Sequence, residues 1–174
     1  MKALRQTLAV LFSVVCLAAC SSVPASPNLP NTPNCAYNWD SQSLPDLTTK
    51  VQAAVKAAGL RGVTASAVAF GEDCNDPKTG QTRGFAVMET DFHVTAQVVD
   101  LTDKETLGNL AKEILKVLDT FPVGKIPGPQ AGYIEITFQS GSDQSNLHFS
   151  VRQGEAARKQ GLHGAALLDK LLEK

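Results

Sequence analysis

Apolar residues recur at helical spacing in the segment that follows Pro45. The residues on this repeating face are Leu47, Val51, Ala54, Val55 and Ala58. The preceding Ser43-Leu44-Pro45-Asp46 is typical of a helix start, because it combines a capping serine, an early proline and an acid near the positive end of the helix dipole. Gly59 favours a helix end. We therefore predict a helix over residues 45–58.

Two segments with strand character come next. Residues 62–71 form the first, and residues 71–83 form a turn-rich loop that contains Cys74. Residues 85–100 then alternate between apolar and polar side chains, which predicts a long strand with one buried face. The inward residues are Ala86, Met88, Thr90, Phe92, Val94, Ala96 and Val98, and the outward residues are Glu89, Asp91, His93, Thr95 and Gln97.

A second helix and two further strands follow. Residues 102–105 have the spacing of a capping box, and the helix after them has its apolar stripe at Leu107, Leu110, Ala111, Ile114, Leu115 and Leu118. Residues 133–139 and 147–152 alternate as strands, with Tyr133, Glu135, His148 and Arg152 among the outward residues. A last helix is expected within residues 155–173, although Gly161 and Gly164 weaken its first half.

These elements predict an α+β fold. Their order is α-β-β-α-β-β-α, and a two-layer sandwich with helices on one face of a four-stranded, mainly antiparallel sheet buries every apolar stripe. The order αββαββ is also a circular permutation of the ferredoxin-like order βαββαβ. That topology would make the strands at 85–100 and 147–152 central neighbours. A meander with another strand order is the alternative.

The N-terminal segment has the features of an export signal. Lys2 and Arg5 precede an apolar run over residues 8–19, whose helical length of about 18 Å is short of the roughly 30 Å membrane core. The run ends in Leu17-Ala18-Ala19-Cys20, which resembles the lipobox of bacterial lipoproteins. The resemblance implies that residues 1–19 are a signal peptide and that the Cys20 thiol is acylated. The alternative is a plain secretory signal, with Cys20 an ordinary residue.

The segment after the lipobox predicts a tether. Residues 20–34 are rich in Pro, Ser and Asn and contain no charge, so they cannot bury enough apolar surface to form a core. We expect a single domain over residues 35–174, held outside the cytoplasm at the cell membrane or the outer membrane by the lipid on Cys20. Removal of Lys2 and Arg5 leaves a mildly acidic chain, which lacks the basic field that nucleic-acid binding requires.

The remaining cysteines predict a disulfide. Once Cys16 has left with the signal peptide and Cys20 is acylated, Cys35 and Cys74 remain in a compartment that permits disulfides. Two free buried thiols or a metal site are the alternatives. A metal site is disfavoured, because neither cysteine belongs to a C-x-x-C unit.

The outward side chains of the strands form the candidate binding face. It comprises Glu89, Asp91, His93, Tyr133, Glu135, His148 and Arg152. Three interpretations stay open: a solvated sheet face, a metal or ligand site, and a docking face with Tyr133 and Phe85 as aromatic anchors. The sequence contains no G-x-S-x-G, H-E-x-x-H, P-loop or G-x-G-x-x-G motif.

These observations favour a non-enzymatic envelope lipoprotein that binds, scaffolds or assists assembly. We expect no catalytic residue, cofactor or metal, and a partner that is an envelope protein or a small ligand. The alternative is an envelope enzyme or a metal- or ligand-binding protein that uses the polar sheet face.

Overall fold

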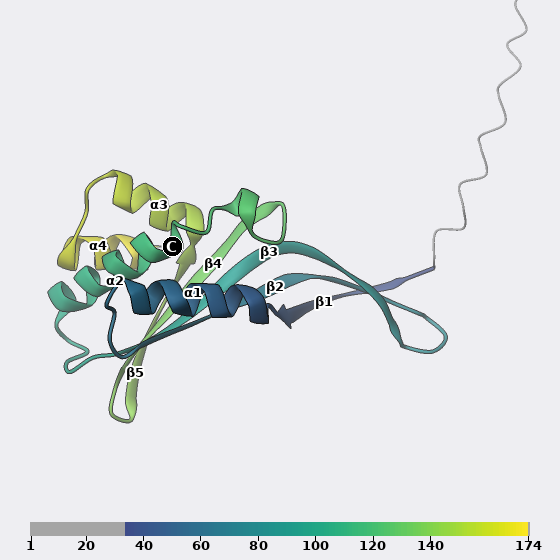
Figure 1. Ribbon diagram of the computed structural model, residues 1–174, viewed down its shortest axis with the longest axis horizontal. Helices are drawn as coiled ribbons and strands as arrows, with labels where there is room; N and C mark the ends of the chain where they lie inside the picture. Colours follow the sequence, from purple (N-terminus) through teal and green to yellow (C-terminus); the bar gives the residue numbers. More distant parts are fainter. Residues whose placement is uncertain (1–33, 174) are drawn as a thin grey trace, which may run out of the picture. The chain divides into compact units, whose positions relative to one another are not determined.

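A computed structural model describes residues 34–173, which contain five strands, four α-helices and a short 3-10 helix (Figure 1). The strands are β1 (Ala36–Ser43), β2 (Val63–Asn75), β3 (Thr82–Gln97), β4 (Gln130–Ser140) and β5 (Asp143–Ser150). The helices are α1 (Pro45–Ala57), α2 (Lys104–Leu118), α3 (Val151–Lys159) and α4 (Gly164–Leu172), with a short 3-10 helix η1 (Val123–Lys125). The predictions for residues 1–33, Cys20 included, lie outside the described residues. Within residues 34–173, no helix is long and apolar enough to cross a membrane.

The five strands form one sheet in the order β1-β2-β3-β4-β5. Neighbouring strands are antiparallel except β3 and β4, which run parallel. The connection between β3 and β4 contains α2, because a chain must cross over the sheet before it can enter a parallel neighbour. The predicted α+β class is confirmed. The sheet nevertheless has one strand more than predicted, and one of its pairs is parallel.

The ferredoxin-like permutation is wrong. It required β3 and β5 to be neighbours, but β4 lies between them and pairs with both. A tight turn at Gly141, with φ of 59°, joins β4 to β5, so β5 is added at the sheet edge beyond β4. The strands therefore follow one another across the sheet in chain order.

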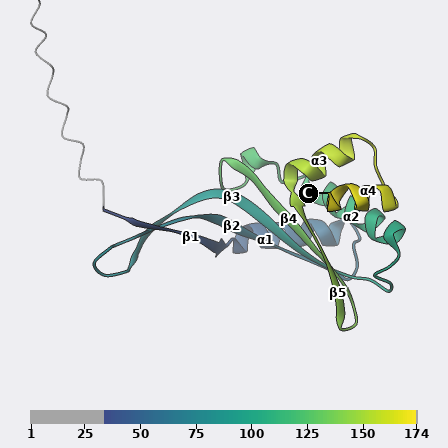
Figure 2. The ribbon, with the colours of Figure 1, turned by 180° about the vertical axis from the view of Figure 1, so that it is seen from behind.

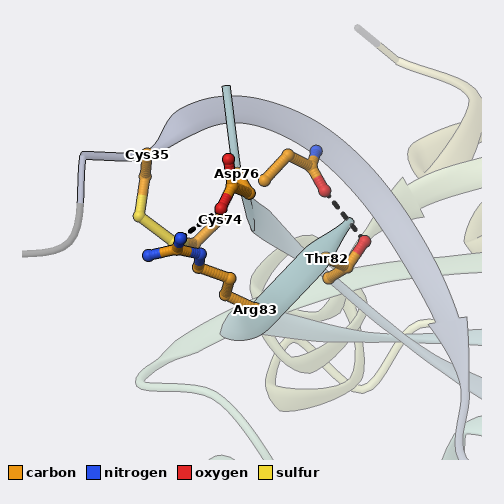
Figure 3. The surroundings of a disulfide bond; sticks show 6 residues. Cys35, Cys74, Asp76, Thr82 and Arg83 are labelled. Atoms are coloured by element: carbon orange, nitrogen blue, oxygen red, sulfur yellow. Dashed lines mark hydrogen bonds and ion pairs between the residues drawn. A yellow bond between two sulfur atoms is a disulfide. The ribbon is translucent and has the colours of Figure 1, made fainter. Parts of the chain in front are cut away.

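The edge strand β1 was not predicted. All eight of its residues are exposed, so its sequence has no alternating buried face that could reveal it. It pairs with β2 along its full length, and the predicted disulfide between Cys35 and Cys74 joins the two strands at one end (Figure 3). Backbone hydrogen bonds and this covalent link hold β1 in place.

The helices pack on one face of the sheet. Seen from behind, the strands lie in front of α1 (Figure 2). The fully buried side chains of the core include Phe92, Ile134, Ile136, Phe138 and Phe149 from the strands and Val51, Val55, Ile114, Leu115, Leu167 and Leu171 from the helices. Each such side chain contributes about 1.5 to 3 kcal/mol on burial, so this interface is the main source of stability.

Two helix starts differ from the prediction. Leu44, not Ser43, is the N-cap of α1, and no side chain caps that end, because the leucine side chain has no hydrogen-bond acceptor. Pro45 in the first turn contributes no N–H of its own. At α2 the N-cap is Asp103, not Thr102, and its carboxylate accepts a hydrogen bond from the N–H of Thr106 at 3.1 Å. The predicted apolar stripe of α2 faces the core, and that of α1 does so except for Ala58, which is exposed at the C-cap.

The boundary between the last predicted strand and the last predicted helix lies earlier in the chain than expected, and the predicted helix is interrupted. β5 ends at Ser150, whose side chain accepts a hydrogen bond from the N–H of Gln153 and caps α3. Arg152 therefore lies in the first turn of α3 and is not the strand residue that we predicted. Gly161, with φ of 73°, separates α3 from α4, so the predicted last helix is two helices.

A bulge in β3 corrects the predicted faces near its start. Phe70 pairs with Glu89, whereas the next residue of β2, Gly71, pairs with Val87, so Met88 is the extra residue. The extra residue reverses the alternation for the residues before it. The ring of Phe85 comes within 3.1 Å of the position that a Cβ on Gly71 would occupy. Phe85 thus shares the face of the buried Gly71 and is not an anchor on the opposite face.

Candidate functional site

The sheet face opposite the helices, which we call the open face, carries most of the predicted site residues. Along β2, along β3 from Thr90 onward and along β4 from Gly132 onward, every second residue is buried under the helices as far as the last residues of each strand. The residues between them are exposed or half-buried. The open face comprises Tyr37, Trp39, Phe70, Glu72, Glu89, Asp91, His93, Tyr133, Glu135 and His148, together with Thr, Ser and Gln residues between them. The structure thus brings together six of the seven predicted residues, and only Arg152 lies elsewhere.

A polar row crosses the centre of the open face. Ser66, His93, Glu135 and His148 are consecutive register partners on β2, β3, β4 and β5. The Nδ1 atom of His93 lies 3.0 Å from Oε2 of Glu135, and both side chains remain partly exposed. In the ferredoxin-like arrangement the two histidines would lie on adjacent strands. Instead Glu135 stands between them, because β4 separates β3 from β5.

Asp91 supports the backbone of the neighbouring strand. The β3–β4 register shifts between Thr90 and Phe92, which leaves the N–H of Tyr133 without a ladder partner. The Oδ1 atom of Asp91 accepts a hydrogen bond from that N–H at 2.7 Å. A Cβ on the buried Gly132 would collide with this carboxylate and with the carbonyl of Thr90, so only glycine permits the contact.

Two aromatic pairs lie on either side of these polar groups. Trp39 of β1 stacks on Phe70 of β2 with ring centroids 5.3 Å apart, and Tyr133 of β4 stacks on His148 of β5 at 4.9 Å. Trp39 is 59% exposed and Tyr133 is 44% exposed, although large aromatic side chains are usually buried. Exposed, stacked aromatics are typical of surfaces that contact another molecule.

Glu89 is the carboxylate with the most perturbed environment on the open face. It is half-buried next to the β3 bulge. Burial raises the pKa of its carboxyl group, and the nearby negative charge of Asp91 raises the pKa further. Ionisation of Glu89 is therefore less favourable than for a free carboxyl group, and a positive charge placed between the two carboxylates would relieve this repulsion.

The open face does not form a metal cluster in the described part of the chain. Within residues 34–173, no three His, Cys, Asp or Glu side chains converge closely enough to hold a metal ion. The His, Asp and Glu side chains of the open face are instead spread over four strands, β2 to β5.

A cavity of about 290 Å³ lies on the helix side of the sheet. Its walls include the apolar side chains Phe92, Leu115, Phe121 and Ile134. At its mouth, Arg158 forms an ion pair with Asp119, and Lys159 lies 3.8 Å from Glu155. The Arg158–Asp119 pair ties α3 to the end of α2, whereas the Lys159–Glu155 pair lies within α3.

The disulfide end of the sheet has its own polar contacts. Cys74 lies beside the turn that joins β2 to β3, where Asp76 forms an ion pair with Arg83 and Thr82 donates a hydrogen bond to Asn75 at 2.8 Å (Figure 3). The pKa of Asp76 is lowered, first by the hydrogen bond from the N–H of Lys78 and then by Arg83. These contacts fix the turn to which the start of β1 is linked.

No family model, curated protein or solved structure matches this chain. The function is therefore argued from the open face itself. Sequence patterns identified its polar residues through the alternation of β3, β4 and β5. The same patterns missed the Trp39–Phe70 pair, because β1 was not recognised as a strand. The spacing of Tyr37 and Trp39 by two residues is the one signal in the sequence that could have indicated this strand.

Proposed function

We propose that this chain is a lipid-anchored binding module of the cell envelope, that it is not an enzyme, and that its open face docks an envelope partner. The observation that carries this proposal is the pairing of His93 with Glu135 between exposed aromatic stacks. Side chains that are ordered by mutual contacts on an uncovered sheet lose little further freedom when a partner binds.

The anchor and the disulfide fit this role together. In the proposal, Cys20 carries the lipid, residues 20–34 form the tether, and Cys35 is the first residue beyond it. The Cys35–Cys74 bond then attaches the end of the tether directly to β2. Tension on the tether would therefore act on a covalently linked sheet and not on a free strand end.

Site-specific photocrosslinking in intact cells tests the docking face. A photoreactive residue replaces Thr64, which is exposed on the open face, and the control replaces Ala53, which is exposed on α1. We expect a discrete crosslinked partner from position 64, lost when His93→Ala and His148→Ala are added, and no such product from position 53. Equal products from both positions, or a product from position 53 only, would contradict the proposal.

A further inference from the structure

We propose that the open face binds an extended, basic segment of a partner polypeptide, with Lys or Arg side chains placed over its carboxylates and aromatic rings. This inference rests on the proposed function and names the chemistry of the partner. It is argued from the distribution of charge between the two layers of the fold, from the spacing of the carboxylates and from the position of the aromatic pairs.

The sheet and the helices carry opposite charge. The strands contain seven acids, Asp40, Glu72, Asp73, Glu89, Asp91, Glu135 and Asp143, and one base, Arg83. The helices α1 to α4 contain nine bases, Lys50, Lys56, Lys104, Lys112, Lys116, Arg152, Arg158, Lys159 and Lys170, and five acids, Asp46, Glu105, Glu113, Glu155 and Asp169. The near-neutral net charge of the chain conceals this difference between the two layers. Asp40 and Asp73 lie on the side of the sheet that faces away from the open face, and the acids that create a negative field over the open face are Glu72, Glu89, Asp91 and Glu135.

The carboxylates of the open face have no Lys or Arg partner within residues 34–173. Glu72, Glu89 and Asp91 form no ion pair there, and Glu135 pairs only with His93. In contrast, four of the five helix acids either pair with a lysine or cap a helix. Four acids without a Lys or Arg partner in the described residues are thus grouped on the open face.

Spacing and flanking groups favour a polypeptide over a single small cation. Glu89 and Asp91 are two residues apart on β3, about 7 Å, which is also the repeat of side chains on one side of an extended peptide. Glu72 and Glu135 lie on the strands to either side, so one small ion cannot reach all four carboxylates. The exposed ring of Trp39 lies on β1 beside Glu72, and that of Tyr133 lies two residues from Glu135 on β4, where both can contact Lys or Arg through cation–π interactions.

A second copy of this chain is disfavoured at this face. Two open faces brought together would oppose their carboxylates without an intervening base, which costs binding free energy. The helix layer of a second copy is basic, however, so head-to-tail association is a competing outcome that the experiment must separate.

The test measures binding of a fluorescent Lys-Thr alternating octapeptide to the mature lipidated chain in nonionic detergent. The open-face variant combines Glu72→Gln, Glu89→Gln, Asp91→Asn and Glu135→Gln, and the amide oxygen introduced by Asp91→Asn keeps an acceptor for the Tyr133 N–H. The control variant carries the same charge change on the helices: Asp46→Asn, Glu113→Gln, Glu155→Gln and Asp169→Asn. Glu89→Gln alone is a milder variant for use if the fourfold variant does not fold.

We expect the open-face variant to bind the peptide about tenfold more weakly than the wild type and the control variant to bind it normally. The wild-type affinity should fall with added salt, and a Glu-Thr peptide should not bind. Equal weakening in both variants, no weakening in either, or self-association of the wild type that blocks the peptide would overturn the inference. If crosslinking from position 64 persists in any of those cases, the proposed function stands and only the basic partner is rejected.

Discussion

The Asp91 carboxylate accepts a hydrogen bond from the backbone N–H of Tyr133 at 2.7 Å, across the one parallel strand pair of the sheet. A side chain of the candidate site thus completes the backbone pairing of the strand beside it. Tyr133 in turn stacks on His148 of β5. Three strands of the open face are therefore coupled through Asp91 and Tyr133, and a change at one of them alters the surface presented by the others.

Gly132→Ala tests this coupling. The added Cβ would displace the Asp91 carboxylate and crowd the carbonyl of Thr90, so we expect a loss of about 1 to 3 kcal/mol in the free energy of unfolding. Urea denaturation measures it. Gly124→Ala is the control, because nothing lies within 4 Å of the position its Cβ would occupy. Equal stability of the two variants would show that the Asp91 contact tolerates a side chain at position 132.

Replacing both disulfide cysteines by serine should release β1. The bond closes a loop between residues 39 positions apart in the sequence. Its removal should therefore lower the free energy of unfolding by about 3 to 4 kcal/mol. Trp39 is the only tryptophan in the chain, and its stacking on Phe70 depends on β1 remaining paired. We therefore expect its fluorescence to change before global unfolding in denaturant. A Trp39 signal that reports only the global transition would show that backbone pairing alone holds β1.

Glu105 should make stability depend on pH. Its carboxylate accepts hydrogen bonds from the N–H of Ala165 at 2.9 Å and from Asn109 at 3.1 Å, and these contacts lower its pKa below the usual 4.5. Because the folded-state pKa is lower than the unfolded one, the stabilisation is complete above the usual value and is lost as the pH falls.

We expect Glu105→Gln to be less stable than the wild type at neutral pH and the difference to shrink at about pH 3. Glu113→Gln is the control, since that side chain bonds only Lys116. Urea titrations at the two pH values provide the measurement. A difference that does not depend on pH would show that the Glu105 charge is unimportant for docking α4 on α2.

Cys20→Ser tests the lipid anchor. In the lipoprotein proposal this thiol is the only attachment to the membrane, so the variant should lose labelling by radioactive palmitate and leave the membrane fraction. Cys16→Ser is the matched control, because that residue would be removed with the signal peptide. Retention of Cys20→Ser in the membrane fraction would support a different mode of attachment.

The fold was predictable where a segment buries one face. The stripe of α2 and the alternation of β4 follow directly from packing, and both are present as predicted. β1 was missed, because an edge strand with all side chains exposed leaves no alternating buried face, and the spacing of Tyr37 and Trp39 was its one signal. The position of β5 could not be predicted, since alternation identifies a buried face but does not specify which neighbour a strand pairs with.

The same distinction applies to the candidate site. Alternation placed His93, Glu135 and His148 on one face, but their sequence gives no indication of the order of the three strands. The contact of Asp91 with the Tyr133 N–H arises from a register shift, and the inward position of Phe85 arises from a bulge. Such irregularities depend on the pairing of two strands and have no pattern within either strand alone.

Chemical labelling of histidine tests the central claim, which is that the open face is the docking surface. The chain has three histidines: His93 and His148 are exposed on the open face, and His163 is exposed at the start of α4. Intact envelopes and the purified protein would be treated with diethylpyrocarbonate, and modification at each site would be quantified by mass spectrometry. The account predicts several-fold protection of His93 and His148 in the envelope, with His163 labelled equally in both samples. Equal labelling of all three histidines in both samples, or protection confined to His163, would contradict it.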